Sequence, residues 1–336
     1  PADGGQLPPQ ARWKRPDLMR VLAVVHMGPP THNAGSELML HTMLRHLVDR
    51  GHECRVLVTR GADRVHQGVT YVTSEGVKRP DGMRAESAAW ADVVVTHLDL
   101  TRDAMRLARA AGKPLVHLVH NHNQLSFHGV TAKSCDLAVM NSRWLAERLD
   151  WRGPQIIVRP PVHQDDYRTT SGDHVAMVNL TASKGCEVFY EMARRRRSDR
   201  FLGVLGAYGH QLVRQIPNVE VTGHTGDMRD DVYARTRVLL MPSDYESWGR
   251  VGVEAMASGI PVIAHPTDGL RESLGTAGIF CDRDDLDAWE RALADLDDPD
   301  RYALASAAAL ARAAEVDELT RTDLAGWESA LHRLVA

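Results

Sequence analysis

The sequence predicts an α/β protein made of two doubly wound, Rossmann-like domains. Short runs rich in β-branched apolar residues alternate with segments whose apolar residues recur at helical spacing. This alternation predicts parallel sheets covered by helices. The pattern is interrupted by the proline-containing stretch 159–163 and then starts again. The length of 336 residues also exceeds that of a usual single core.

The first half of the chain supplies the elements of an N-terminal domain. Residues 20–26 form an apolar run that predicts a buried strand. Residues 36–50 carry their apolar side chains on one helical face and end before Gly51, which is typical of a helix stop. Further strands are expected at 53–59, 92–96, 114–119, 136–140 and 155–158, and further helices at 101–111 and 142–149.

The second half repeats this organisation in a C-terminal domain. Strands are expected at 175–180, 201–205, 219–222, 238–241, 261–264 and 278–280, and helices at 184–196, 230–235, 251–258, 284–296, 302–314 and 319–335. We therefore expect an N-terminal domain over 18–160, a C-terminal domain over 161–318, and a last helix over 319–336 that packs back toward the N-terminal domain. Residues 1–17 are proline-rich and polar, which predicts a flexible lead-in segment.

The composition is that of an ordinary globular protein, with 43% hydrophobic and 25% charged residues. The formal net charge of -4 argues against nucleic acid as the main partner, although a local basic patch stays open. No apolar run approaches the ~20 residues that span a bilayer, and no signal peptide is recognised. The four cysteines lie far apart without a CxxC spacing, as in reduced proteins. We expect a cytoplasmic protein, with peripheral membrane association left open.

The most informative stretch is 242–275, where a predicted strand leads through a polar loop into a helix. The loop contains Glu246 and Gly249, and the helix contains Glu254. A helix N-terminus presents free N–H groups and partial positive charge, which suit a phosphate. Glu254 can accept hydrogen bonds from the two hydroxyls of a ribose, and Glu246 from sugar hydroxyls. One loop and one helical turn can thus hold ribose, diphosphate and sugar together.

Glu246 and Glu254 enclose seven residues, and the run EAMASGIPVI that starts at Glu254 is followed by a loop and Glu272. This stretch resembles the E-x7-E signature of the retaining GT-B glycosyltransferases of family 4, and the resemblance extends over roughly residues 18–330. It implies a GT-B fold, in which two Rossmann-like domains face a central cleft, with the acceptor on the N-terminal side and the donor on the C-terminal side. The alternative is that Glu246 is solvated and Glu254 pairs with a nearby arginine.

The resemblance also implies an activity. It is the metal-independent transfer of a sugar, with retained configuration, from a nucleotide-diphosphate sugar to an acceptor hydroxyl, without a cofactor. A hexosyltransferase using a UDP- or GDP-sugar is expected first. The acceptor is not indicated, and small molecules, lipid carriers, glycans and modified nucleic acids are all candidates. The oligomeric state is also not indicated.

Two further loops match parts of the resembled donor site. A glycine turn follows the first strand, and Ala34-Gly35 stands where the family has Gly-Gly. After the strand at 175–180, Lys184 matches a family lysine that neutralises the leaving diphosphate. Asn179 stands where the family has an arginine, so one cation is missing there. Arg159, Arg214 and Arg250 are the candidates to replace it.

The histidine-rich stretch 116–128 supplies the last candidate site residues. The resemblance assigns His120 to the donor sugar and the acceptor side, whereas His117 is expected in the core and His122 and His128 in the loop or acceptor region. A metal cluster is the alternative for these histidines, but their spacing fits no closed zinc pattern, and no metal is expected. The expected catalytic residues are His120, Lys184 and Glu246. The expected donor-binding residues are Gly35, Asn179, Lys184, Gly223, His224, Glu246, Trp248, Gly249, Arg250, Val251 and Glu254.

Two other functions are compatible with the sequence. A nucleotide-sugar 2-epimerase shares the GT-B architecture, but it needs several carboxylates around the sugar. A non-catalytic nucleotide-sugar-binding protein is the second, and Asn179 is the feature that favours it. The motif Asp282-Arg283-Asp284 resembles the metal-binding DxD of a different transferase fold, but it directly precedes a predicted helix, so helix capping is the preferred interpretation.

Overall fold

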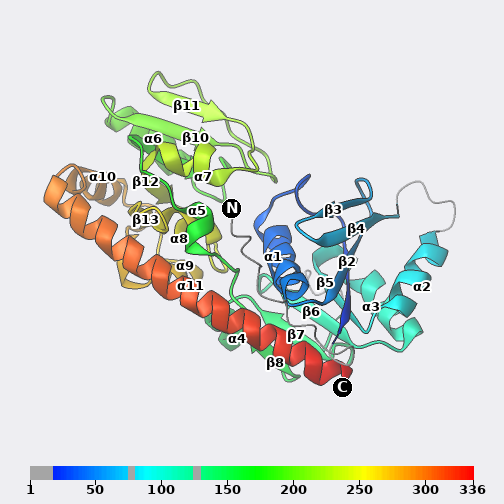
Figure 1. Cartoon of the computed structure of the whole chain (residues 1–336). Coiled ribbons are helices and arrows are strands. Elements are labelled where there is room, and N and C mark those ends of the chain that lie inside the picture. The colour runs from blue at the N-terminus through cyan, green and yellow to red at the C-terminus, as the bar shows by residue number, and fades with distance from the viewer. Residues whose placement is uncertain (1–17, 75–79, 124–129) are drawn as a thin grey trace, which may run out of the picture.

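The computed structural model describes residues 18–74, 80–123 and 130–336. It contains two sheets, one in each half of the chain (Figure 1). The N-terminal sheet has eight strands in the order β3-β4-β2-β1-β5-β6-β7-β8, and the C-terminal sheet has six in the order β11-β10-β9-β12-β13-β14. All pairs are parallel except β3 with β4. Both sheets are therefore doubly wound, as the alternating pattern predicts.

The N-terminal sheet is centred on β1, which is buried along almost its whole length. Its strands are β1 (Arg20–Val25), β2 (Glu53–Val58), β3 (Arg64–His66), β4 (Val69–Thr73), β5 (Val93–His97), β6 (Leu115–Val119), β7 (Leu137–Met140) and β8 (Gln155–Ile157). Its helices are α1 (Gly35–Asp49), α2 (Pro80–Trp90), α3 (Thr101–Ala111) and α4 (Arg143–Arg148). Helix α1 packs its apolar face on the sheet, since Met39, Met43 and Leu47 are buried in the same cluster as the strands.

The C-terminal sheet is centred on β9 and β12. Its strands are β9 (His174–Val178), β10 (Arg200–Val204), β11 (Val219–Thr222), β12 (Thr236–Met241), β13 (Val262–Ala264) and β14 (Ile279–Phe280). Its helices are α5 (Gln164–Tyr167), α6 (Cys186–Arg195), α7 (Met228–Asp231), α8 (Arg250–Met256), α9 (Asp268–Leu274), α10 (Leu286–Asp295) and α11 (Pro299–Val335). The aromatic residues Phe189, Tyr190 and Phe201 pack edge to face between α6 and β10.

Several elements were not anticipated. Helices α2, α5 and α9 lie in segments rich in polar residues, which hide the helical period. Strand β4 was also not expected, although its residues, VTYVT, are typical of a strand. The β3–β4 hairpin turns at Gln67-Gly68, where both residues have positive φ, as a two-residue turn requires. The helix expected at 230–235 is replaced by the short α7 and a 3-10 turn, Tyr233–Arg235.

Helix α11 joins the two helices expected at 302–314 and 319–335 into a single one. The residues between them, 315–318, include no glycine or proline, and Val316 is buried, so nothing breaks the helix there. Asp298 caps its start by accepting hydrogen bonds from the main-chain N–H groups of Asp300 and Arg301. Figure 1 shows α11 running from orange to red along both domains.

The two domains share side chains of α11. Ala309 and Ala313 belong to the C-terminal core, whereas Trp327 and Leu331 belong to the N-terminal core. The linker between the sheets is fixed to the same helix, because Arg159 forms an ion pair with Asp323 at 2.9 Å. Helix α11 therefore helps to fix how the two sheets face one another, together with direct contacts between the domains such as the hydrogen bond from Trp144 Nε1 to the carbonyl of Ser247 at 2.8 Å.

Two further features concern the cysteines and the character of the helices. The four cysteines are free and buried in the described structure. Among the described residues, no helix combines the length and apolar character needed to cross a membrane.

Replacing Trp327 with alanine should destabilise the N-terminal domain by about 3–5 kcal/mol, the usual loss for a fully buried aromatic side chain. Trp327 is 0% exposed, whereas Leu304 on the same helix is 73% exposed. The control Leu304→Ala should therefore cost less than about 0.5 kcal/mol. Urea unfolding of both variants measures the difference, and equal losses would contradict the shared-core role of α11.

Candidate active site

A cavity of about 730 Å³ lies between the two domains. On the C-terminal side, its wall is formed where β9, β10 and β12 end and by the loop and helix that follow β12. On the N-terminal side, the loop after β1 and helix α1 complete the wall. Open α/β sheets bind ligands at these carboxyl ends of strands. The cavity is therefore the candidate active site.

Most of the residues expected at the donor site line this cavity. They are Gly35, Asn179, Lys184, His224, Glu246, Gly249, Arg250, Val251 and Glu254. Three expected residues, His120, Gly223 and Trp248, are not part of its lining. The structure thus gathers residues from four separate loops around one space.

Lys184 and Glu246 form an ion pair inside the cavity. Lys184 lies in the loop after β9 and Glu246 in the loop after β12, and Lys184 Nζ lies 2.5 Å from Glu246 Oε1. Ser243 donates a second hydrogen bond to the same oxygen at 2.9 Å. The lysine side chain keeps 30% of its surface exposed, so its remaining N–H donors can reach a ligand. The pair therefore presents a cation and a carboxylate oxygen side by side.

Gly249 sets the start of helix α8. Its φ of +78° is the left-handed conformation that favours glycine, and a Cβ atom there would overlap the side chain of Leu270. The chain can therefore turn sharply from the loop of Glu246 into the helix of Glu254. The N–H of Gly252 donates to the Gly249 carbonyl at 3.0 Å, and the two N–H groups before it precede the first helical acceptor.

Glu254 is held in a buried network. Its Oε2 accepts a hydrogen bond from Tyr233 at 2.7 Å, and its Oε1 is paired with Arg250. Arg250 in turn donates to the hydroxyl of Tyr167 at 2.6 Å. Burial lowers the pKa of Arg250, but Tyr167 and the Glu254 carboxylate together raise it above its ordinary value, and burial raises the pKa of Tyr167 to about 12. The alternative pairing of Glu254 with an arginine is thus present, and Glu254 still lines the cavity.

Asn179 occupies the left-handed region with a φ of +70°. This conformation is tolerated by asparagine and is costly for most other residues that carry a Cβ atom. Of the three arginines considered as replacements for the missing cation, Arg159 pairs with Asp323 and Arg214 pairs with Glu187. Only Arg250 among them lines the cavity. Two arginines that the sequence did not single out, Arg45 and Arg229, line it as well.

His120 lies at the end of β6, outside the lining of the cavity. Its Nε2 is 2.8 Å from Nδ1 of His97, and its main-chain carbonyl accepts a hydrogen bond from Asn141. Burial lowers the pKa of both His97 and His120 to about 3, so both rings are neutral at pH 7. The His97–His120 pair was not anticipated, because the two residues come from different strands.

The other histidines of the stretch 116–128 lie in different environments. His117 is buried, as expected for a core residue. The ring of His122 packs against Tyr245, with 5.1 Å between ring centroids. His128 lies outside the described residues.

Trp248 requires a correction. Its side chain is 1% exposed and packs with Val162, Val253 and Val316 at the junction of the domains, so it does not face the cavity. A large apolar ring gains more from that burial than from a polar wall. Gly223 also lies outside the lining, which begins in this segment at His224.

A contact across the cleft was missed from the sequence. Tyr208, in the loop after β10, donates a hydrogen bond to Glu37 Oε1 in α1 at 2.7 Å. Its ring also meets His32 edge to face, with centroids 4.7 Å apart. Tyr208 and Glu37 are 171 positions apart, so no local pattern could reveal the contact.

The motif at 282–284 also has a structural role. Asp282 Oδ1 accepts a hydrogen bond from the main-chain N–H of Asp284, and the neighbouring Asp285 caps α10 through the N–H of Ala288. The motif therefore forms a turn ahead of α10, and the capping residue is Asp285 rather than a residue of the motif.

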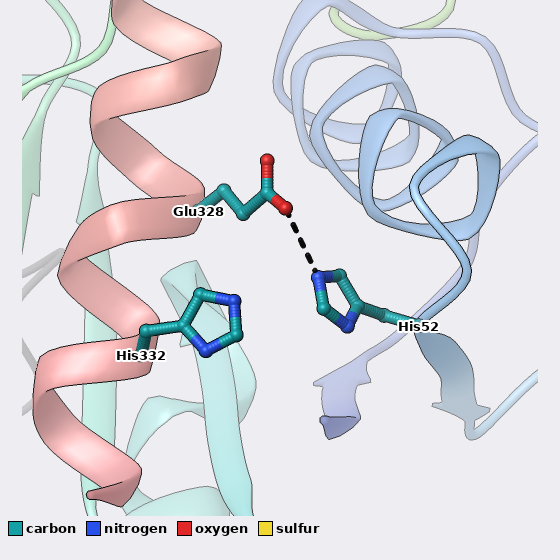
Figure 2. A group of neighbouring side chains, drawn as sticks. All are labelled: His52, Glu328 and His332. Carbon is teal, nitrogen blue, oxygen red and sulfur yellow. Dashed lines mark hydrogen bonds and ion pairs between the residues drawn. The ribbon is translucent and has the colours of Figure 1, made fainter. Parts of the chain in front are cut away.

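A second polar cluster joins α11 to the N-terminal domain. Figure 2 shows Glu328 and His332 of α11 beside His52, and His52 Nε2 donates to Glu328 at 3.2 Å. His52 Nδ1 accepts the main-chain N–H of Met19, so its single proton resides on Nε2. A metal at Nε2 would need that proton removed, and the Arg50 guanidinium already lies 3.2 Å from Glu328. The cluster therefore fits a hydrogen-bonded clasp better than a metal site.

Part of the chain is similar in sequence to known glycosyltransferases. Residues 174–298 match the family model described as "Glycosyl transferases group 1". A D-inositol 3-phosphate glycosyltransferase of Thermobispora bispora is 37% identical over 107 residues, which is 31% of this chain and 23% of that protein. The O-antigen chain mannosyltransferase B of Escherichia coli is 37% identical over 83 residues, 24% of this chain and 22% of that protein. The chain thus matches under a quarter of the length of these relatives.

Most of the chain resembles solved structures. HepE of Anabaena in complex with UDP-glucose superposes with a TM-score of 0.71 at 17% identity, covering 93% of this chain and 100% of that one. A sucrose-phosphate synthase of Thermosynechococcus elongatus gives 0.71 at 14% identity, covering 94% and 98%. The fold is therefore that of the GT-B proteins. Within it, the C-terminal domain carries the segment that matches the glycosyl transferases group 1.

Replacing Glu254 with alanine should destabilise the protein by about 3–5 kcal/mol, because Arg250 would be left buried without its carboxylate. Glu246→Ala is the matched comparison from the same loop and helix. Its partner Lys184 is partly exposed, so the loss should be about 1 kcal/mol. Chemical unfolding of both variants tests this difference, and a smaller loss for Glu254→Ala than for Glu246→Ala would contradict it.

Proposed function

We propose that this protein is a retaining glycosyltransferase that moves a hexosyl group from a nucleotide-diphosphate sugar to an acceptor hydroxyl. The observation that carries the proposal is the joint position of Lys184, Glu246 and Glu254 around one interdomain cavity. All three belong to the segment that matches the glycosyl transferases group 1. The Anabaena structure with UDP-glucose makes a uridine nucleotide the first donor to examine.

Each residue has a distinct role in this proposal. Glu254 accepts hydrogen bonds from the ribose hydroxyls, although part of its capacity is used by Tyr233 and Arg250. Lys184 and the main-chain N–H groups at the start of α8 bind the diphosphate. Glu246 accepts hydrogen bonds from the donor sugar, oriented by Lys184 and Ser243.

The transfer breaks the bond between the anomeric carbon and the diphosphate oxygen and forms a bond from that carbon to the acceptor oxygen. The acceptor proton passes to the leaving phosphate oxygen on the same face of the sugar, which retains the configuration. Lys184 stabilises the negative charge that develops on the leaving group. Because side-chain cations and main-chain donors supply this stabilisation, the proposal requires no metal. Closure of the two domains excludes water and limits hydrolysis.

The donor can be identified by a thermal-shift screen with UDP-, GDP-, ADP- and TDP-sugars. A ligand present at about 100 times its dissociation constant adds about 2.7 kcal/mol of stability, so one nucleotide should raise the melting temperature clearly. Lys184→Gln should reduce the shift, whereas Lys133→Gln, at an exposed lysine outside the cavity, should leave it unchanged. The absence of a shift with every donor would contradict the proposal.

The reaction is then assayed with the donor that binds. The acceptor panel begins with inositol phosphates, named for the Thermobispora relative, and extends to lipid carriers, glycans and modified nucleic acids. NMR of the product gives the anomeric configuration. An inverted product would contradict retention, and a donor whose sugar is epimerised without an acceptor would indicate a 2-epimerase instead. A donor that binds but is never turned over would indicate a non-catalytic binding protein.

A further inference from the structure

The carboxamide of Gln211 is surrounded by hydrogen-bond partners that fix its orientation. Its Oε1 accepts two main-chain N–H groups, those of Leu180 and Gly206, each at 2.9 Å. Only an oxygen can accept from these donors, so the assignment of oxygen and nitrogen is unambiguous. Its Nε2 then donates to Asn179 Oδ1 at 2.9 Å and to the carbonyl of Tyr208 at 2.7 Å. Both ends of the amide are therefore fully used.

This arrangement determines the orientation of Asn179. Because Gln211 presents N–H groups, Asn179 must turn its oxygen toward Gln211 and its NH2 group away. Asn179 lines the interdomain cavity, and its Nδ2 has no partner among the described residues. Gly206 supports this rotamer, since a Cβ atom there would overlap the Asn179 side chain. The end of the amide left for a ligand is thus a donor of two hydrogen bonds.

The neighbourhood of this NH2 group identifies the ligand atoms that it suits. Asn179 begins the loop after β9 that leads to Lys184, and both side chains line the same cavity. The left-handed backbone at this position is tolerated better by asparagine than by most other residues with a Cβ atom, and Asn179 offers a neutral donor where an arginine was expected. Neutral N–H donors bind phosphate oxygens well when a cation lies close by.

We propose that Gln211 is a positioning residue, which locks the Asn179 amide so that its NH2 group donates to the diphosphate of the sugar nucleotide. The proposal rests on the donor site proposed above and adds a residue to it. Gln211 does not touch the ligand; it acts through Asn179. Its role predicts an effect on the phosphate part of the ligand and no effect on the nucleoside part.

The test substitutes Gln211 with glutamate, which has the same shape. One carboxylate oxygen can still accept from Leu180 and Gly206. The other now faces both Asn179 Oδ1 and the carbonyl of Tyr208, to which it cannot donate. The Asn179 amide must then turn over and present its oxygen to the diphosphate. Binding titrations should show at least tenfold weaker affinity for UDP, because a hydrogen bond to a charged group is lost, while the affinity for uridine changes less than about twofold.

Two further variants distinguish the orientation of the Asn179 amide from the effect of an added negative charge. Asn179→Asp leaves all four hydrogen bonds of Gln211 available and places an oxygen where the NH2 group was, so it should weaken UDP and spare uridine in the same way. Gln215→Glu introduces the same charge at an exposed position of the same loop and should change neither affinity more than about twofold. If the wild-type chain prefers another base, the diphosphate and nucleoside of that base replace UDP and uridine.

The outcomes separate this proposal from the previous one. Wild-type binding of UDP together with unchanged UDP affinity in Gln211→Glu and Asn179→Asp would overturn the role of Gln211 and leave the donor site standing. Equal losses for UDP and uridine would mean that Gln211 only supports the fold, which also overturns it. A wild-type chain that binds no nucleoside diphosphate would overturn both proposals.

Discussion

Helix α11 contributes side chains to the cores of both domains, and the relative position of the two sheets depends on this sharing. Ala313 packs in the C-terminal core and Trp327 in the N-terminal core of the same helix. The linker is tied to it by the pair of Arg159 with Asp323. Each sheet alone would present only one wall of a ligand site at its strand ends. Helix α11 and direct contacts between the domains, such as Tyr208 to Glu37, hold these ends opposite one another, and the space between them is a cavity lined by both domains.

Within that cavity, the polar groups are largely neutralised by one another before any ligand arrives. Lys184 is paired with Glu246, and Arg250 with Glu254. A buried charge without a partner is costly, so such pairing allows cations and carboxylates to occupy one partly enclosed space. An incoming diphosphate would therefore add to existing pairs rather than meet isolated cations. Because the cations are already paired, a neutral, oriented donor such as the Asn179 amide contributes more to diphosphate binding than it would beside an unpaired arginine.

The sequence predicted those features that depend on residues close to one another in the chain. Apolar runs located the central strands of both sheets, and the compact stretch from Glu246 to Glu254 located the C-terminal wall of the cavity. Prediction failed where long-range packing decides the outcome. Trp248 follows Glu246 closely but turns into the domain junction, and Tyr208 meets Glu37 from a distant part of the chain. Helix α9 was missed because its polar residues mask the helical period, whereas β4 was missed although its residues, VTYVT, are typical of a strand. Likewise, no sequence pattern indicates that Gln211 orients Asn179.

The most direct test of this account is a crystal structure of the protein with the sugar nucleotide that it binds. The account predicts the diphosphate within about 3 Å of Lys184 Nζ and Asn179 Nδ2, the usual hydrogen-bond range. The ribose hydroxyls should lie on Glu254 and the sugar on Glu246. A nucleotide bound outside the interdomain cavity, or one whose ribose lies away from Glu254, would contradict it.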